Sequence, residues 1–136
     1  MSNELEVIFL LNVERKIPQF DVIGVGHVAL DNLGIVETYP QLDQRVRLKD
    51  FLRQGGGEVA TALVTMARLG AKVSFVGKVG DDEAGEFLLK EFLQEGVDIS
   101  HLVKEKGKMS LTAFCIIDQK SGKRTIFWYK NLTPLR

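Results

Sequence analysis

The chain has 136 residues, of which 45% are hydrophobic and 26% are charged, a balance that is ordinary for a single globular domain. Eighteen Lys and Arg residues match eighteen Asp and Glu residues, so charge gives no reason to expect nucleic acid or an anionic membrane as a partner. One cysteine, Cys115, and two histidines, His27 and His101, exclude an internal disulfide and a Cys/His metal cluster. Cys115 lies in the apolar run LTAFCIID, which favours a buried packing thiol over a nucleophile.

The N-terminal residues 1–19 have an apolar core of only Val7 to Leu11, which predicts a short strand. Glu4 and Glu6 precede it, where a signal peptide would carry positive charge. No apolar run approaches the ~18 residues of a membrane span. We therefore expect a cytoplasmic protein without membrane attachment.

The next segments predict two strands and a helix. DVIGVGHVAL (21–30) indicates a buried strand that ends near Gly26, because Val and Ile run through it. QRVRLKDFL (44–52) alternates apolar and basic side chains, which is typical of a strand with one wet face. Residues 59–69 have apolar side chains at helical spacing, and Gly70 stands where a left-handed glycine ends a helix.

A second strand and helix follow. AKVSFVGKVG (71–80) predicts a buried strand, and Asp81 or Asp82 is placed to cap a helix over 83–95. VDISHLV (97–103) predicts a short strand.

The C-terminal part predicts a hairpin of LTAFCIID (111–118) and RTIFWYK (124–130), joined by QKSGK. The strand–helix–strand order before it indicates a parallel α/β sheet with right-handed crossovers. The alternating strands do not fit inside such a sheet, so we expect them to form a separate, half-exposed sheet that covers something.

Three glycines, Gly55 to Gly57, lead directly into the first helix. They cost backbone entropy but let a ligand approach the main chain, and the helix points free N–H groups the same way. A tight strand-to-helix turn explains the spacing equally well. The run is not a P-loop, because no Gly-Lys-Ser/Thr occurs in the chain, and GVGHVA lacks the third glycine of the dinucleotide fingerprint.

Asp31 directly follows the predicted strand 21–30, at the end where open α/β sheets bind ligands. Its carboxylate suits paired hydroxyl groups, since hydrogen bonds to a charged group contribute about 1.5–3 kcal/mol each. A turn-forming aspartate in LDN is the competing interpretation.

Several stretches in this order resemble the N-terminal half of the ribokinase (PfkB) carbohydrate kinase family, especially its ketohexokinase-like members. They are DVIGVGHVALD, QGGGEVATALVTMARLGAKVSFVGKVGDDEAGEFLLKEFLQEGVDISHLV and LTAFCIIDQKSGKRTIFWYK. The resemblance covers about residues 20–131 and assigns 20–136 to the N-terminal part of a kinase domain. Residues 1–19 remain an extension of unknown role.

The resemblance implies a Rossmann-like α/β sandwich, here partial, with a small β-sheet lid built from residues 32–52 and 111–130. It also implies ATP- and Mg²⁺-dependent phosphorylation of a sugar or a related polyol or nucleoside. Lid sheets of this family often pair, so a homodimer is expected. Either Ile126 and Trp128 or Phe127 and Tyr129 would then lie at the interface, with packing of the lid on the core as the alternative.

By position, the resemblance makes Asp31 the acceptor of sugar hydroxyls and brings Gly56 and Gly57 close to the sugar. Thr61 stands where relatives place an asparagine that holds hydroxyls, and it makes fewer hydrogen bonds than an amide. Arg124 matches a basic lid residue that faces phosphate or sugar; a solvated charge is the alternative for it.

Two further positions bear on the resemblance. Glu58 replaces a small or amide residue of many relatives and would bind more hydroxyls or repel a phosphorylated substrate. For Asp81 and Asp82, in the family's GDD turn, helix capping is favoured over a role in binding.

The family's Gly-Ala-Gly-Asp motif, whose aspartate is the general base, does not occur in these 136 residues. The nucleotide site of the family also belongs to its other half. The sequence therefore predicts the sugar-binding and lid part of a kinase, without a catalytic residue of its own. A non-catalytic binding or dimerisation module is the alternative.

Overall fold

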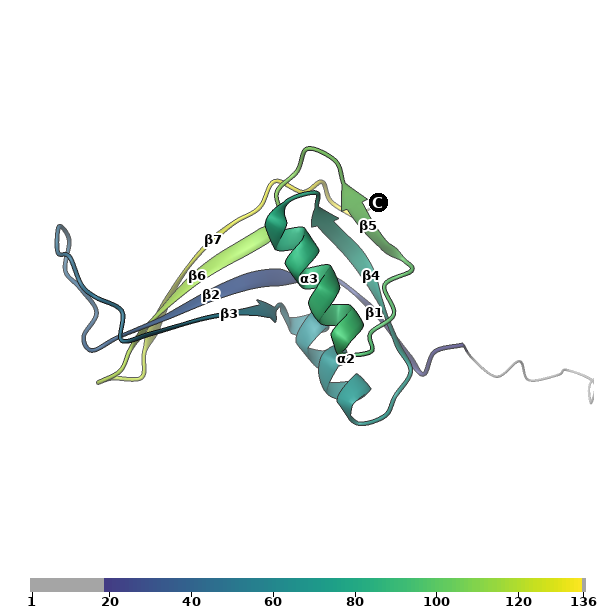
Figure 1. The fold of residues 1–136 in the computed structure, drawn as a ribbon, viewed down its shortest axis with the longest axis horizontal. Coiled ribbons are helices and arrows are strands. Elements are labelled where there is room, and N and C mark those ends of the chain that lie inside the picture. Colours follow the sequence, from purple (N-terminus) through teal and green to yellow (C-terminus); the bar gives the residue numbers. More distant parts are fainter. Residues whose placement is uncertain (1–18, 136) are drawn as a thin grey trace, which may run out of the picture.

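The computed structural model describes residues 19–135, and the strand predicted at Val7 to Leu11 lies outside them. The described elements are, in chain order, β1 (Val22–Val25), β2 (Ala29–Val36), β3 (Asp50–Gly56), α2 (Glu58–Arg68), β4 (Val73–Gly80), α3 (Glu83–Gln94), β5 (Leu102–Glu105), β6 (Leu111–Asp118) and β7 (Arg124–Tyr129). They form a core of one sheet with two helices, and a second sheet that extends away from it as a lid (Figure 1).

The core sheet has the strand order β1-β4-β5, and both pairings are parallel. A parallel pair needs a crossover, and α3 supplies it between β4 and β5. This confirms the expected α/β sheet.

Glycines flank helix α2: Gly57 is its N-cap, and Gly70 follows its C-terminal end. Gly70 has φ = 95°, its N–H donates to the Ala67 carbonyl at 2.9 Å, and the N–H of Ala71 donates to Met66 at 3.1 Å. A left-handed residue with these two bonds is how a helix closes its last turn. The predicted C-cap is therefore confirmed.

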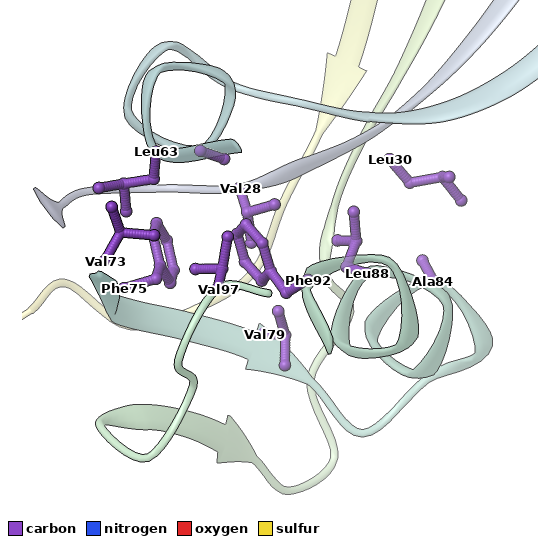
Figure 2. Close-up of a cluster of buried hydrophobic side chains, with 11 residues drawn as sticks. Val28, Leu30, Leu63, Val73, Phe75, Val79, Ala84, Leu88, Phe92 and Val97 are labelled. Atoms are coloured by element: carbon purple, nitrogen blue, oxygen red, sulfur yellow. The ribbon is translucent and has the colours of Figure 1, made fainter. Parts of the chain in front are cut away.

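The hydrophobic core lies between α2, α3 and the core sheet (Figure 2). Phe75 of β4 is fully buried, and its ring centroid lies 4.9 Å from that of Phe92 on α3. Burying a side chain of this size contributes about 1.5–3 kcal/mol. Val28 and Leu30 enter the same cluster from the start of the lid, so the lid and the core share one apolar centre.

The lid sheet has the order β3-β2-β6-β7. Strand β2 is antiparallel to β3 and parallel to β6, and β6 and β7 form the predicted hairpin. Paired residues share a face of a sheet. Asp31, Ala113 and Trp128 are paired across three strands, and we call their side of the sheet the site face.

The strand predicted in 21–30 does end near Gly26, because β1 stops at Val25, but the chain then enters the lid at β2, so the expected position of Asp31 at the end of a core strand is wrong. Gly26 lies between the two, and a β-carbon there would sit 2.7 Å from Val59 of α2. Asp31 is consequently the third residue of a lid strand and does not directly follow a core strand.

The predicted strand 44–52 lies too early in the sequence. Strand β3 runs from Asp50 to Gly56, so it includes two of the three glycines. The lid accordingly comprises 29–36, 50–56, 111–118 and 124–129, where the sequence predicted 32–52 and 111–130. Residues 37–49 form the connection at the far end of the lid (Figure 1).

The sequence predicted that β1 would be buried on both faces, and this prediction is wrong. The side chains of Ile23 and Val25 are 58% and 62% exposed, because the two described helices cover only the other face. Cys115 is buried, as predicted. None of the helices in residues 19–135 has the length and apolar character needed to cross a membrane.

Candidate functional site

Asp31 is a partly buried carboxylate that the described residues leave without a partner. Desolvation by burial raises the pKa of its carboxyl. No residue within 19–135 donates a hydrogen bond to this carboxylate or forms an ion pair with it. Partial desolvation disfavours the ionised form of this carboxyl, and the hydroxyl groups of a ligand would stabilise that form.

The space beside each of the three glycines is filled by protein atoms. The Asp31 carboxylate lies against Gly56, where a β-carbon would collide with it. The N–H of Gly55 donates to Glu91 Oε2 at 2.5 Å. Gly57 has φ = 97°, and a β-carbon there would lie 2.8 Å from the His27 carbonyl oxygen. The turn interpretation is thus confirmed for Gly57, and the lack of a side chain at Gly56 makes room for the Asp31 carboxylate.

Two clefts meet at Asp31 and Gly57. The first, the helix cleft, has a volume of about 350 Å³ and lies between α2, α3 and the end of β3. Its polar lining includes Asp31, Thr61, Thr65, Arg68, Glu91 and Glu95. Arg68 and Glu95 close one end through two hydrogen bonds of 2.7 and 2.5 Å.

The second cleft, the lid cleft, has a volume of about 330 Å³ and lies on the site face of the lid. Its lining combines apolar side chains with four ionisable ones and comprises His27, Ala29, Asp31, Gly57, Glu58, Leu111, Ala113, Ile126, Trp128 and Lys130. His27 Nε2 lies 3.1 Å from Glu58 Oε2 across its mouth. This mixture of an apolar floor with a few convergent polar groups is typical of small-molecule sites.

The structure brings four of the five predicted site residues together. Asp31, Gly56, Gly57 and Thr61 line the helix cleft, and Asp31 and Gly57 also line the lid cleft. Arg124 opens β7, pairs with Ile117 and lines neither cleft. It lies four residues along the strand from Trp128, or about 13 Å from the row that holds Asp31.

Asp82 belongs to the scaffold. It accepts hydrogen bonds from the N–H of Gly85 at 3.0 Å and from the N–H and hydroxyl of Ser110 at 3.0 and 2.7 Å. Burial alone would raise the pKa of this carboxyl, but the bonds from Ser110 and Gly85 outweigh it and lower the pKa. Helix capping by Asp82 is confirmed, and the same carboxylate ties α3 to the start of lid strand β6.

Sequence reasoning did not find His27, Glu91 or Lys130 as part of these clefts. For Lys130 a signal existed, because it continues the alternation of Ile126 and Trp128 on one face of the hairpin. The contact between Glu91 and Gly55 joins residues 36 positions apart, and no local pattern indicates it.

The fold and the site define an α/β core with a β-sheet lid over an acidic pocket. The profile of the pfkB family carbohydrate kinases matches residues 20–133, and the chain belongs to this family.

Similar proteins extend this finding. The chain is 30% identical to a ketohexokinase of Mus musculus and 40% identical to a 5-dehydro-2-deoxygluconokinase of Clostridium perfringens. Each alignment covers 83% of this chain, and 38% and 32% of the relatives. A fructokinase of Xylella fastidiosa with bound ATP superimposes with a TM-score of 0.63 at 30% identity, over 79% of this chain and 32% of that one. The chain therefore spans about a third of the length of its relatives.

Proposed function

We propose that this chain supplies the sugar-binding pocket and the lid of an ATP-dependent carbohydrate kinase. The reaction would move the γ-phosphoryl group of ATP to a hydroxyl of a sugar or of a related polyol or nucleoside. The observation that carries the proposal is the Asp31 carboxylate, which is partly desolvated, has no described partner and lines both clefts. Sugar hydroxyls are donors of the kind that such a carboxylate lacks.

Membership of the family implies the use of ATP, but the described residues do not fit a site for Mg²⁺-ATP. Within residues 19–135 no group of three His, Cys, Asp or Glu side chains could hold a metal ion. The space beside the glycine run, where backbone N–H groups would cradle a phosphate, is filled by the carboxylates of Asp31 and Glu91 and the backbone of His27. Both carboxylates would repel a phosphate. We therefore assign this chain the acceptor side of the reaction only.

The test is to measure sugar binding and phosphoryl transfer separately on the 136-residue chain. Calorimetry with a panel of sugars, polyols and nucleosides is expected to find at least one ligand whose binding Asp31→Ala abolishes. Phosphoryl transfer from Mg²⁺-ATP well above background would contradict the acceptor-side assignment. The absence of any ligand in the panel would contradict the sugar pocket.

We also propose that two copies pair through their lids, which would suit either a kinase or a non-catalytic module. Phe114 and Phe127 are direct neighbours on the face opposite Asp31, and their side chains are 54% and 56% exposed. Trp128 and Ile126 line the lid cleft instead, so the Phe127 and Tyr129 face suits a second copy better. Sedimentation velocity should show a dimer that Phe127→Glu dissociates, and a wild-type monomer at micromolar concentration would contradict the pairing.

A further inference from the structure

The lid cleft is lined by four ionisable side chains, and two of them are in contact with each other. His27 and Glu58 are in contact at 3.1 Å. Asp31 and Lys130 line the same cleft, and neither has an ion-pair partner among residues 19–135. The cleft thus offers a ligand one free carboxylate and one free ammonium group.

The register of the lid places these two groups at opposite corners of the cleft floor. Asp31 on β2 is paired with Ala113, which is paired with Trp128. Lys130 follows two residues after Trp128, directly beyond the end of β7 at Tyr129, and lines the same cleft. Strands lie about 4.8 Å apart and rise about 3.3 Å per residue, so the α-carbons of Asp31 and Lys130 are separated by about 12 Å.

Both residues line the cleft, and a separation of this order suits a short chain of carbon atoms between their charged groups. Trp128, 65% exposed, and Ala113 lie between or beside the two charges and provide an apolar surface. A six-carbon polyol fits this arrangement when its hydroxyls meet Asp31 and its other end carries a negative charge.

We propose that the acceptor substrate is a sugar acid, whose carboxylate binds Lys130 while its hydroxyls bind Asp31. This inference rests on the proposed function and names the substrate class for the same site. A monoanionic carboxylate suits one ammonium group. A phosphorylated sugar carries more charge, which the carboxylates of Asp31 and Glu58 disfavour.

The experiment is calorimetry on the full chain with matched probes. D-gluconate and D-glucitol are both open-chain six-carbon polyols, and they differ only in a carboxylate at one end. D-glucuronate and D-glucose are the corresponding pair of ring-forming probes, and D-glucose 6-phosphate carries the phosphorylated alternative. Lys130→Ala removes the ammonium group, and Lys123→Ala makes the same charge change in the exposed hairpin turn outside both clefts.

Each acid is expected to bind about tenfold more tightly than its neutral partner. Lys130→Ala should remove that difference, whereas Lys130→Arg and Lys123→Ala should preserve it. Acids that bind no better than neutral probes, or tighter binding of D-glucose 6-phosphate than of D-gluconate, would overturn the inference.

The two proposals fail in different ways. If neutral probes bind with a dependence on Asp31 and the acids gain nothing, the sugar pocket stands and the role of Lys130 is wrong. If no probe of either kind binds, the sugar pocket is wrong and the sugar-acid inference fails with it.

Discussion

Asp31 and Asp82 are both partly buried carboxylates beside glycines, and they have opposite relations to the protein. Asp82 accepts three hydrogen bonds from Gly85 and Ser110, and its pKa is lowered. Asp31 accepts none from residues 19–135, and its pKa is raised. The hydrogen bonds of Asp82 thus hold the fold together, whereas the carboxylate of Asp31 keeps its capacity to accept hydrogen bonds from a ligand.

The largest expected effect is on binding at Asp31. Asp31→Ala removes the proposed acceptor of sugar hydroxyl groups, so the affinity for a sugar ligand should fall by about 100-fold. The melting temperature should stay the same or rise, because a desolvated charge is removed. Calorimetry and thermal unfolding measure both quantities. Asp50→Ala is the control, since Asp50 lies on the neighbouring lid strand β3 and outside both clefts. Equal losses of affinity in the two variants would contradict the role of Asp31.

At Asp82 the expected effect is on stability. Asp82→Ala removes a helix cap and the bonds to Ser110, which should lower the free energy of unfolding by about 2–3 kcal/mol. Urea denaturation followed by circular dichroism measures it. Asp81→Ala is the matched control, because Asp81 accepts one hydrogen bond, from the N–H of Gly107. A loss no larger than that of Asp81→Ala would show that the three bonds of Asp82 are not stabilising.

Gly57, which joins lid strand β3 to helix α2, allows a test with a smaller expected effect. Gly57→Ala places a β-carbon against the His27 carbonyl at positive φ, which should cost about 1–3 kcal/mol of unfolding free energy. Gly70→Ala has a similar φ of 95° but open space around it, so it should cost less, about 1 kcal/mol. The difference in urea midpoint between the two variants isolates the collision, and equal midpoints would contradict it.

The smallest expected effect is on the pH dependence of stability. The folded-state pKa of Asp82 is lowered, so its contribution is complete above the unfolded pKa of about 3.9 and is lost as pH falls through the folded value. Asp31 has the opposite sign: its raised pKa destabilises the folded chain at neutral pH, and that cost disappears as pH falls toward 4. Urea midpoints of Asp82→Asn and wild type should therefore converge at acidic pH. Those of Asp31→Asn and wild type should diverge as pH rises to neutral. Parallel profiles would contradict both assignments.

The parts of the fold that sequence predicted well are those set by local patterns. Helical spacing, the aspartate cap and the glycine stop located α2 and α3 to within a residue or two. The boundary between core and lid was wrong, because the apolar run 21–30 is continuous across it. At the point where the chain divides, Val59 packs against Gly26, and this contact joins residues that are far apart in sequence.

The residues of the candidate site also divide into those that local sequence patterns indicate and those that only tertiary packing brings in. Asp31, Gly56 and Gly57 could be proposed from their residue types and positions, and the structure brings them together. The carboxylate of Glu91 at Gly55 and the position of Lys130 beside Asp31 depend on how α3 and β7 approach β2 and β3. Such approaches are set by tertiary packing, so local sequence patterns do not contain them.

The most direct test of the account is an NMR titration of the aspartate carboxyl carbons with and without a bound sugar ligand. Without ligand, the pKa of Asp31 should lie above its ordinary value and that of Asp82 below. Hydroxyl donors stabilise the ionised form, so saturation with the ligand should lower the pKa of Asp31 and leave that of Asp82 unchanged. A pKa of Asp31 that does not move when the ligand is bound would contradict the claim that this carboxylate holds the sugar.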